Sequence, residues 1–227
     1  MNLETGDFPG PFITISRQAG CSAKRIAIKL SKILTGYSYM ADTKTDAEWK
    51  WVNKDIFSQI VREMIDEVIS GAYDNKNGDG VQFLKTVDKA FADETLYDIT
   101  DNNLIRTLKG IICRLACQGR TIIVGRSAGA LLKNVPNKLN IRLEAPLDWR
   151  INRIMQMNDI SRARAEKYIT EMDEKRDSFI EKVIGRKAEN NDFDVIFNYA
   201  SLEDDLIIDA VVNILRHKQI VAPYSEY

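Results

Sequence analysis

The chain has 227 residues, 44% of them hydrophobic, and its 32 Lys and Arg residues nearly balance 33 Asp and Glu residues, for a net charge of -1. This length and composition predict one globular domain, 1–227, with a large core. The balanced charge argues against a nucleic-acid polymer or a membrane surface as partner, because either would require a basic excess. Without a secretory leader pattern or an apolar run of membrane-spanning length, the sequence predicts a cytoplasmic protein.

The first apolar segment, residues 12–16, predicts a buried strand. A turn of small residues, 19–23, follows it, and a helix begins near Lys24. Such a junction directs backbone N–H groups and the positive end of the helix dipole at one point, where a polyphosphate can bind. Because the same junction also begins any ordinary βαβ unit, the rest of the chain has to distinguish the two readings.

The turn departs from the standard phosphate-binding loop, G-x-x-x-x-G-K-[ST]. With Gly20 as the fourth residue, the first, sixth and seventh positions hold Arg17, Ser22 and Ala23, and Lys24 falls one position late. One residue corresponds to about 100° around a helix, so the lysine would point away from its usual phosphates unless its stem bends back or Arg17 replaces it. The candidate nucleotide-binding residues are Arg17, Gln18, Ala19, Gly20, Cys21, Ser22, Ala23, Lys24 and Arg25.

Further apolar segments predict strands at residues 121–124, 139–143 and 194–198, with helical segments between them and an amphipathic helix after the last. Strands that alternate with helices and consist of continuous apolar runs indicate a parallel sheet covered on both faces. The sequence therefore predicts an α/β fold of three layers. Between the first helix and residue 121, apolar residues at helical spacing predict two more helices, over 56–68 and 104–115, and polar segments predict loops at 41–46 and 75–80.

Cysteine and histidine offer little further chemistry. Cys113 and Cys117 lie on one apolar helix face and are expected to be reduced packing residues. Cys21 has two readings, a small residue that fits a tight turn or a thiol made reactive by the helix N-terminus. The lone His217 is expected to complement a helix dipole, so neither a histidine metal centre nor a Ser-His triad is predicted.

Taken together, the segments resemble the cytidylate kinase-like family, a branch of the P-loop nucleoside monophosphate kinases. The pieces that carry the resemblance keep the family's order and spacing and span most of the chain: 13–20 (ITISRQAG), 26–27 (IA), 124–126 (VGR), 145–154 (APLDWRINRI), 175–177 (KRD) and 193–198 (FDVIFN). The resemblance implies a P-loop NTPase fold with a core at about 12–36 and 118–217, a helical insertion at about 54–100 that closes over the acceptor nucleotide, and an Arg-rich lid at about 158–190.

The resemblance also implies roles for several charged residues. Phosphoryl transfer mainly requires a protein to position anionic phosphates and neutralise their charge, which arginine does well. Arg126, just past a buried strand, would hold the acceptor phosphate, and Arg162 and Arg176 would reach the transferring phosphate from a mobile lid oriented by Asp177. With Lys24, these four residues are the catalytic candidates. The candidate acceptor-binding residues are Asn53, Arg126, Arg150, Arg153 and Asp194.

Two of these candidates have an equally plain structural explanation. Asn53 stands where the family often has Asp; it cannot act as a carboxylate base, and a role as a turn or N-cap residue explains it as well as a nucleotide contact does. Arg153, like Arg164, is also typical of a solvated helix with i,i+4 charge pairs, and that reading is favoured for each of them individually.

The resemblance thus implies a phosphotransferase that moves the γ-phosphate of ATP to a nucleoside monophosphate, CMP, dCMP or a related small acceptor, with Mg²⁺ as the bridging ion. The usual Mg²⁺-binding Ser or Thr is missing, and Ser16 and Ser22 are the nearby replacements. Two alternatives stay open. One is a non-catalytic nucleotide-binding protein whose altered loop has lost turnover, and the other is a protein-interaction scaffold that keeps the architecture without binding nucleotide.

Overall fold

The computed structural model describes residues 10–40, 48–69, 85 and 102–221. Its centre is a parallel sheet with the strand order β2-β3-β1-β4-β5. The strands are β1 (Phe12–Arg17), β2 (Lys50–Val52), β3 (Thr121–Val124), β4 (Lys138–Glu144) and β5 (Val195–Asn198). The α/β class and the parallel sheet predicted from the apolar runs are confirmed, and the short edge strand β2 completes the sheet.

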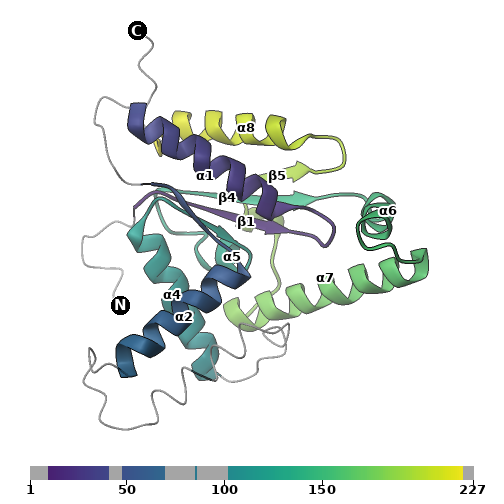
Figure 1. The fold of residues 1–227 in the computed structure, drawn as a ribbon, viewed down its shortest axis with the longest axis horizontal. Helices are drawn as coiled ribbons and strands as arrows, with labels where there is room; N and C mark the ends of the chain where they lie inside the picture. Colours follow the sequence, from purple (N-terminus) through teal and green to yellow (C-terminus); the bar gives the residue numbers. More distant parts are fainter. Residues whose placement is uncertain (1–9, 41–47, 70–84, 86–101, 222–227) are drawn as a thin grey trace.

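Helices cover both faces of this sheet (Figure 1). Helices α1 and α8 pack on one face, and α2, α4, α5 and the C-terminal part of α7 share the core of the other. Their bounds, with those of α6, are α1 (Ala23–Met40), α2 (Lys54–Ile69), α4 (Asn102–Gln118), α5 (Ala128–Leu131), α6 (Leu147–Asn158), α7 (Arg162–Ile184) and α8 (Asp204–His217). The expected insertion at 54–100 is described continuously as far as Ile69, where α2 ends. The loops expected at 41–46 and 75–80 lie outside the described residues.

The central strand is buried on both sides, which explains its continuous apolar sequence. Ile13 and Ile15 face the α1 and α8 core, whereas Phe12 faces the opposite core. The buried polar residue between them is paired: the Thr14 hydroxyl donates to Asn140 Oδ1 at 2.9 Å. The Asn140 amide in turn donates to a carbonyl in α5, so this pair joins two strands to the helix beyond β3.

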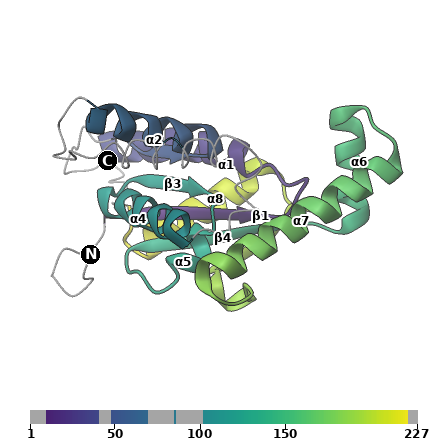
Figure 2. The same ribbon diagram turned by 90° about the horizontal axis from the view of Figure 1, so that it is seen from below.

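Helices α6 and α7 extend beyond the end of the sheet at which its strands finish (Figures 1 and 2). They pack on each other through a small apolar cluster that also includes Ala19 from the turn after β1. Ser161 caps the start of α7 and Gly185, with φ 78°, ends it. With 23 residues, α7 is about 35 Å long, so it reaches from α6 back to the core below the sheet. It occupies most of the region expected to be the lid.

In the described part of the chain, no helix combines the length and the apolar character that crossing a membrane requires.

Candidate phosphate-binding site

The carboxyl ends of β1, β3 and β4 meet beside α7, at the edge of the sheet where open α/β folds bind ligands. A cavity of about 70 Å³ lies there. It is lined by Ser16, Arg17, Gln18, Gly125, Arg126, Ser127, Arg142, Asp173, Arg176, Asp177, Phe179 and Ile180. Four arginines and two aspartates therefore line a space that holds roughly five water molecules. A small anion fits this cavity, whereas typical ligand sites measure several hundred Å³.

The turn after β3 supplies one wall of this cavity in an unusual backbone conformation. Gly125, Arg126 and Ser127 have φ values of 76°, 57° and 60°. The left-handed region costs a residue with a side chain roughly 1–2 kcal/mol, and such strain gathers at functional sites. Arg126 and Ser127 are 8% and 6% exposed, and the Ser127 hydroxyl has no hydrogen-bond partner among the described residues. The strained turn thus lines the cavity with a buried cation and a buried hydroxyl.

The turn between β1 and α1 uses several of its N–H groups within the protein. The N–H of Gln18 donates to the Leu143 carbonyl at 3.0 Å, and that of Cys21 to the Gln18 carbonyl at 3.2 Å. The Ala19 N–H donates to Asp173 Oδ1 at 2.7 Å. By contrast, the N–H groups at positions 20, 22 and 24 donate to no acceptor in the described part of the chain. The predicted group of free amides is therefore present only in part. The N–H groups at positions 19, 21 and 23 already donate hydrogen bonds within the protein, and those at 20, 22 and 24 remain for a ligand.

Arg150 holds this turn in shape rather than pointing into the cavity. Its guanidinium donates to Ala145 O at 3.0 Å, to Ala19 O at 3.3 Å and to Asp173 Oδ2 at 2.6 Å, and the residue is 7% exposed. Gly20 lies against it with φ 92°, and a Cβ at this glycine would be 3.1 Å from Arg150 Cβ. In this conformation internal partners thus occupy Nε and Nη1 of Arg150, which supports the turn, and acceptor binding by Arg150 stays a prediction.

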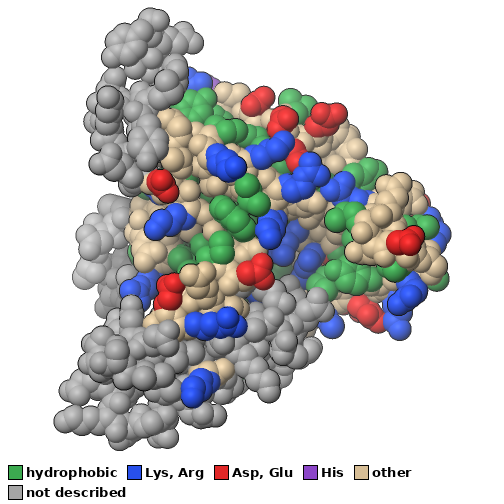
Figure 3. All heavy atoms as spheres, viewed as in Figure 1, with side chains coloured by type: hydrophobic (Ala, Val, Ile, Leu, Met, Phe, Trp, Pro, Cys, Tyr) green, Lys and Arg blue, Asp and Glu red, His purple; other side chains and the backbone are tan. Residues whose placement is uncertain are grey.

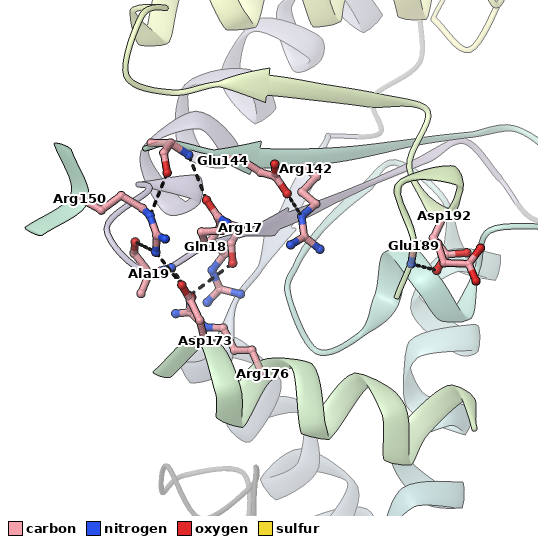
Figure 4. A network of polar contacts seen from close by, with 11 residues as sticks. Arg17, Gln18, Ala19, Arg142, Glu144, Arg150, Asp173, Arg176, Glu189 and Asp192 are labelled. Atoms are coloured by element: carbon pink, nitrogen blue, oxygen red, sulfur yellow. Dashed lines mark hydrogen bonds and ion pairs between the residues drawn. The ribbon is translucent and has the colours of Figure 1, made fainter. Parts of the chain in front are cut away.

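Helix α7 contributes both aspartates that line the cavity, Asp173 and Asp177, and Figure 4 shows Asp173. Asp173 lies between Ala19 and Arg150, and Arg176 Nη1 lies 3.7 Å from it while donating to Arg17 O at 3.3 Å. Burial raises the pKa of the Asp177 carboxyl, although Arg142 and Arg176 partly oppose this. The predicted residues Arg17, Arg126, Arg176 and Asp177 are thus brought together around one cavity.

Sequence reasoning missed Asp173 and Arg142 as members of this group. Asp173 stands three residues before Arg176, a spacing that places both on one face of a helix, so the pair was available as a signal. Arg142 interrupts the apolar β4 strand between Ile141 and Leu143, and its Nε donates to Glu144 at 2.6 Å. For Arg142 the corresponding signal was a charged residue near the carboxyl end of a buried strand.

A larger cavity of about 440 Å³ lies on the other side of the turn, between α1, α6 and the segment that joins β5 to α8. Arg153 is central to it. Its guanidinium carbon lies 5.2 Å from the Trp149 ring centroid and 5.4 Å from that of Tyr199, and its Nη2 donates to Ser22 Oγ at 3.0 Å. The solvated i,i+4 reading of Arg153 is therefore wrong, because the side chain contacts aromatic rings and the turn. Lys and Arg side chains gather on this face of the molecule, between α1 and the α6 and α7 pair (Figure 3).

Three other candidates lie outside both cavities. Lys24 is exposed at the start of α1, and its Nζ lies 5.7 Å from the Trp51 ring centroid, toward the sheet edge. Arg162 forms an exposed ion pair with Asp148. Asn53 caps α2: its Oδ1 accepts hydrogen bonds at 3.1 Å from the N–H groups of Asp55 and Ile56, the second and third residues of the helix. For Asn53 the structure supports the capping role.

Asp194 lies at the opposite end of the sheet, just before β5. Its carboxylate accepts hydrogen bonds from Asn140 N–H at 2.7 Å and from Lys138 Nζ at 2.9 Å. Burial raises the pKa of Asp194, but these two bonds outweigh it and hold the pKa below its ordinary value. The expected contact with substrate is corrected, since this aspartate joins β4 to β5 at the amino ends of the strands.

Cys21 is a packing residue, the first of its two readings. Its side chain belongs to the α1 and α8 core, and the residue is 8% exposed. Burial raises the pKa of the thiol to about 11, against the opposing effect of Arg150. Because the thiolate is the reactive form, the thiol at this turn is unreactive near neutral pH.

The parallel sheet, the turn between β1 and α1, and the arginines at the carboxyl edge define a protein with a nucleotide kinase-like fold. The chain belongs to the cytidylate kinase-like family, whose model matches residues 12–201. The predicted family is thereby confirmed.

Solved structures include relatives of low sequence identity. An uncharacterized protein from Eubacterium ventriosum ATCC 27560 is 18% identical, covers 91% of this chain and 98% of its own, and has a TM-score of 0.61, which shows a shared fold. A shikimate kinase from Bacteroides thetaiotaomicron is 14% identical over 91% of this chain and 97% of its own, with a TM-score of 0.48. No curated protein matches the chain.

Proposed function

We propose that the protein is a phosphotransferase that moves the γ-phosphate of ATP to a nucleoside monophosphate, with CMP, dCMP or a related small acceptor as its substrate. The observation that carries this proposal is the convergence of Arg17, Arg126, Arg142 and Arg176 on one cavity at the carboxyl edge of the sheet. Phosphoryl transfer demands little covalent chemistry from a protein. It needs two phosphates aligned and their charge stabilised, and guanidinium groups supply both.

The two cavities on either side of the β1 to α1 turn suit the two ends of a donor nucleotide. A base would enter the 440 Å³ cavity and stack on the Arg153 guanidinium or on the rings of Trp149 and Tyr199. Its phosphate tail would then run along the turn, where the N–H groups of Gly20 and Ser22 donate to no acceptor in the described part of the chain. The terminal phosphate would arrive at the arginine-lined cavity.

The acceptor phosphate is assigned to Arg126, which is buried just past the end of β3 and lines the same cavity. CMP and dCMP are proposed because the sequence resembles the cytidylate kinase-like family. Asn53 is engaged in capping α2 and gives no contact that would select a base. Monophosphates of other bases therefore belong in any first substrate screen.

Mg²⁺ would enter with the phosphates. In the described part of the chain no three acidic, His or Cys residues form a cluster that could hold a metal alone. In nucleotide sites Mg²⁺ is usually coordinated by one or two protein carboxylates, and phosphate oxygens and water molecules supply the remaining ligands. The Asp177 carboxylate and the Ser16 hydroxyl are oxygen donors that line the cavity, and they would hold the ion there. When bound, Mg²⁺ neutralises charge on the transferring phosphate.

A nucleotide-binding protein without turnover is the second candidate, and the position of Lys24 favours it. The ammonium group faces Trp51 rather than the turn, so the contact that a P-loop lysine makes with the β- and γ-phosphates is missing from this conformation.

Calorimetric titration with ATP and Mg²⁺, combined with a transfer assay on CMP, dCMP, UMP and AMP, separates these functions. Binding with transfer to any of the four supports the kinase. Binding without transfer supports the second candidate, and absence of ATP binding leaves the interaction scaffold.

A further inference from the structure

Asp173 lies on the lid helix α7 but makes its strongest contacts with other parts of the chain, namely Ala19 in the turn that precedes α1 and Arg150 in helix α6. Its Oδ1 accepts the Ala19 N–H at 2.7 Å, and its Oδ2 accepts from Arg150 Nη1 at 2.6 Å. Both distances fall in the range of charge-assisted hydrogen bonds. A backbone N–H ahead of a helix and an arginine fork are also the donors that bind phosphate oxygens.

We infer that the Asp173 carboxylate takes the place of a donor phosphate in the protein without nucleotide, so that a phosphate tail reaches the Ala19 N–H and the Arg150 guanidinium only by displacing it. The inference rests on the proposed function in one respect, namely that the displacing anion belongs to a nucleotide. It assigns Asp173 a positioning role that family membership and the four cavity arginines do not by themselves suggest.

The surroundings of Asp173 contain more donors than one carboxylate satisfies. Arg176 Nη1 is 3.7 Å from its Oδ1, and the buried Arg176 Nε has no hydrogen-bond partner among the described residues. An anion with several oxygens would therefore meet more donors here than the carboxylate does, so exchange of Asp173 for a phosphate is favourable in charge and in hydrogen bonding.

The position of Asp173 on α7 links this exchange to the lid. In the present conformation the cavity between α7 and the sheet edge measures about 70 Å³, which is too small for a nucleotide to enter. Ala19 packs in the same apolar cluster as Ile169 and Met172 of α7, so this contact and the Asp173 bond hold the helix against the turn together. When the Asp173 carboxylate is released, its hydrogen bonds to Ala19 and Arg150 are lost, only the apolar contact remains, and α7 can move.

The inference is tested with inorganic tripolyphosphate, which carries the phosphate tail without base or sugar. Asp173→Asn removes the competing charge and leaves the Arg150 charge for the ligand, so this variant should bind tripolyphosphate about fivefold more tightly than the unmodified protein in calorimetry. Glu174→Gln is the matched control, because it removes the same charge from an exposed neighbour on the same helix, and it should change the affinity by less than about twofold.

A purely structural role of Asp173 predicts the opposite change in tripolyphosphate affinity. If Asp173 only stabilises the turn, Asp173→Asn loosens it and weakens tripolyphosphate binding, and an equal or weaker affinity overturns the inference. Failure of both proteins to bind tripolyphosphate overturns it as well. Tight binding together with absent ATP turnover would leave the inference standing while the kinase proposal fails.

Because Asp173→Asn leaves a buried arginine without its counter-charge, that variant can fail to fold. Nuclear magnetic resonance on the unmodified protein then tests whether tripolyphosphate displaces the Asp173 carboxylate. During a tripolyphosphate titration, the Ala19 amide signal and the Asp173 carboxyl carbon signal should shift with the same midpoint, and a coupling through the hydrogen bond should appear between the Ala19 nitrogen and phosphorus. Binding that leaves both signals in place overturns the inference.

Discussion

The Arg17 guanidinium packs directly on the Cα of Gly125, so closely that a Cβ at this glycine would lie 2.1 Å from Arg17 Nη1. The two residues end neighbouring strands, and the Gly125 N–H donates to Ile15 O at 3.0 Å. The absence of a side chain at Gly125, directly after β3, thus leaves the space that the guanidinium of Arg17 occupies.

Gly125→Ala should damage both stability and anion binding. The alanine would have to adopt φ 76°, at a cost of roughly 1–2 kcal/mol, and its methyl group would displace the Arg17 guanidinium. We expect a lower free energy of unfolding in urea and weaker tripolyphosphate binding by calorimetry. Gly110→Ala is the control, because no atom lies within 4 Å of the added Cβ in helix α4, and there alanine should raise stability by up to about 1 kcal/mol. Equal effects of the two changes would contradict this account.

Arg126→Ala should lower kcat/KM for the acceptor by at least about tenfold, because a buried guanidinium that holds a phosphate through charge-assisted bonds is lost. The measurement is steady-state transfer with the acceptor varied at saturating ATP. Arg164→Ala removes an exposed arginine from α7 and should leave the same parameter unchanged. If both variants retain full activity, Arg126 does not belong to the acceptor site.

Lys24→Ala should change the ATP dissociation constant by less than about threefold, since Nζ faces the Trp51 ring and a cation-π contact at an exposed site contributes only about 0.5–1 kcal/mol. Arg17→Ala, in contrast, should weaken ATP binding by about tenfold or more, because it removes a cation from the cavity. Calorimetry with both variants checks the pair. A large loss in Lys24→Ala alone would show that the lysine bends back to the phosphates when ATP binds.

Asp192→Asn should reduce the free energy of unfolding by about 2 kcal/mol at pH 7, since the fully buried carboxylate accepts hydrogen bonds from Arg186 at 2.5 Å and Lys133 at 2.9 Å. The Arg186 bond holds the pKa of Asp192 well below its ordinary value, despite burial. A depressed carboxyl pKa adds stability above the unfolded-state value near pH 4, and this is lost as the pH falls through the folded-state pKa.

Urea unfolding at pH 7 and pH 3 measures that dependence. The difference between the unmodified protein and Asp192→Asn should shrink at the lower pH. The exposed pair of Lys29 and Asp205 provides the control, and Asp205→Asn should have little effect at either pH. A difference that is independent of pH would show that packing, rather than charge, accounts for the role of Asp192.

Apolar runs predicted the long strands because a parallel sheet buries both faces of each strand, so consecutive residues of the strand are apolar. The positions of Arg17 and Arg126 at the edge followed from the ends of those runs. The hydrogen bonds of the turn could not be predicted in this way. Asp173 lies 154 residues from Ala19, and their contact depends on how α6 and α7 fold back, which local patterns do not encode. For the same reason the direction of Lys24 toward Trp51 required the structure.

The burial of Cys21 has a practical consequence for studying the turn. Its thiol is sheltered by the α1 and α8 core, whereas Cys117 at the end of α4 is exposed. A maleimide dye added at neutral pH will therefore attach to Cys117 first and leave the carboxyl ends of the strands unblocked. The native protein thus already offers a site for fluorescence measurements of ligand binding.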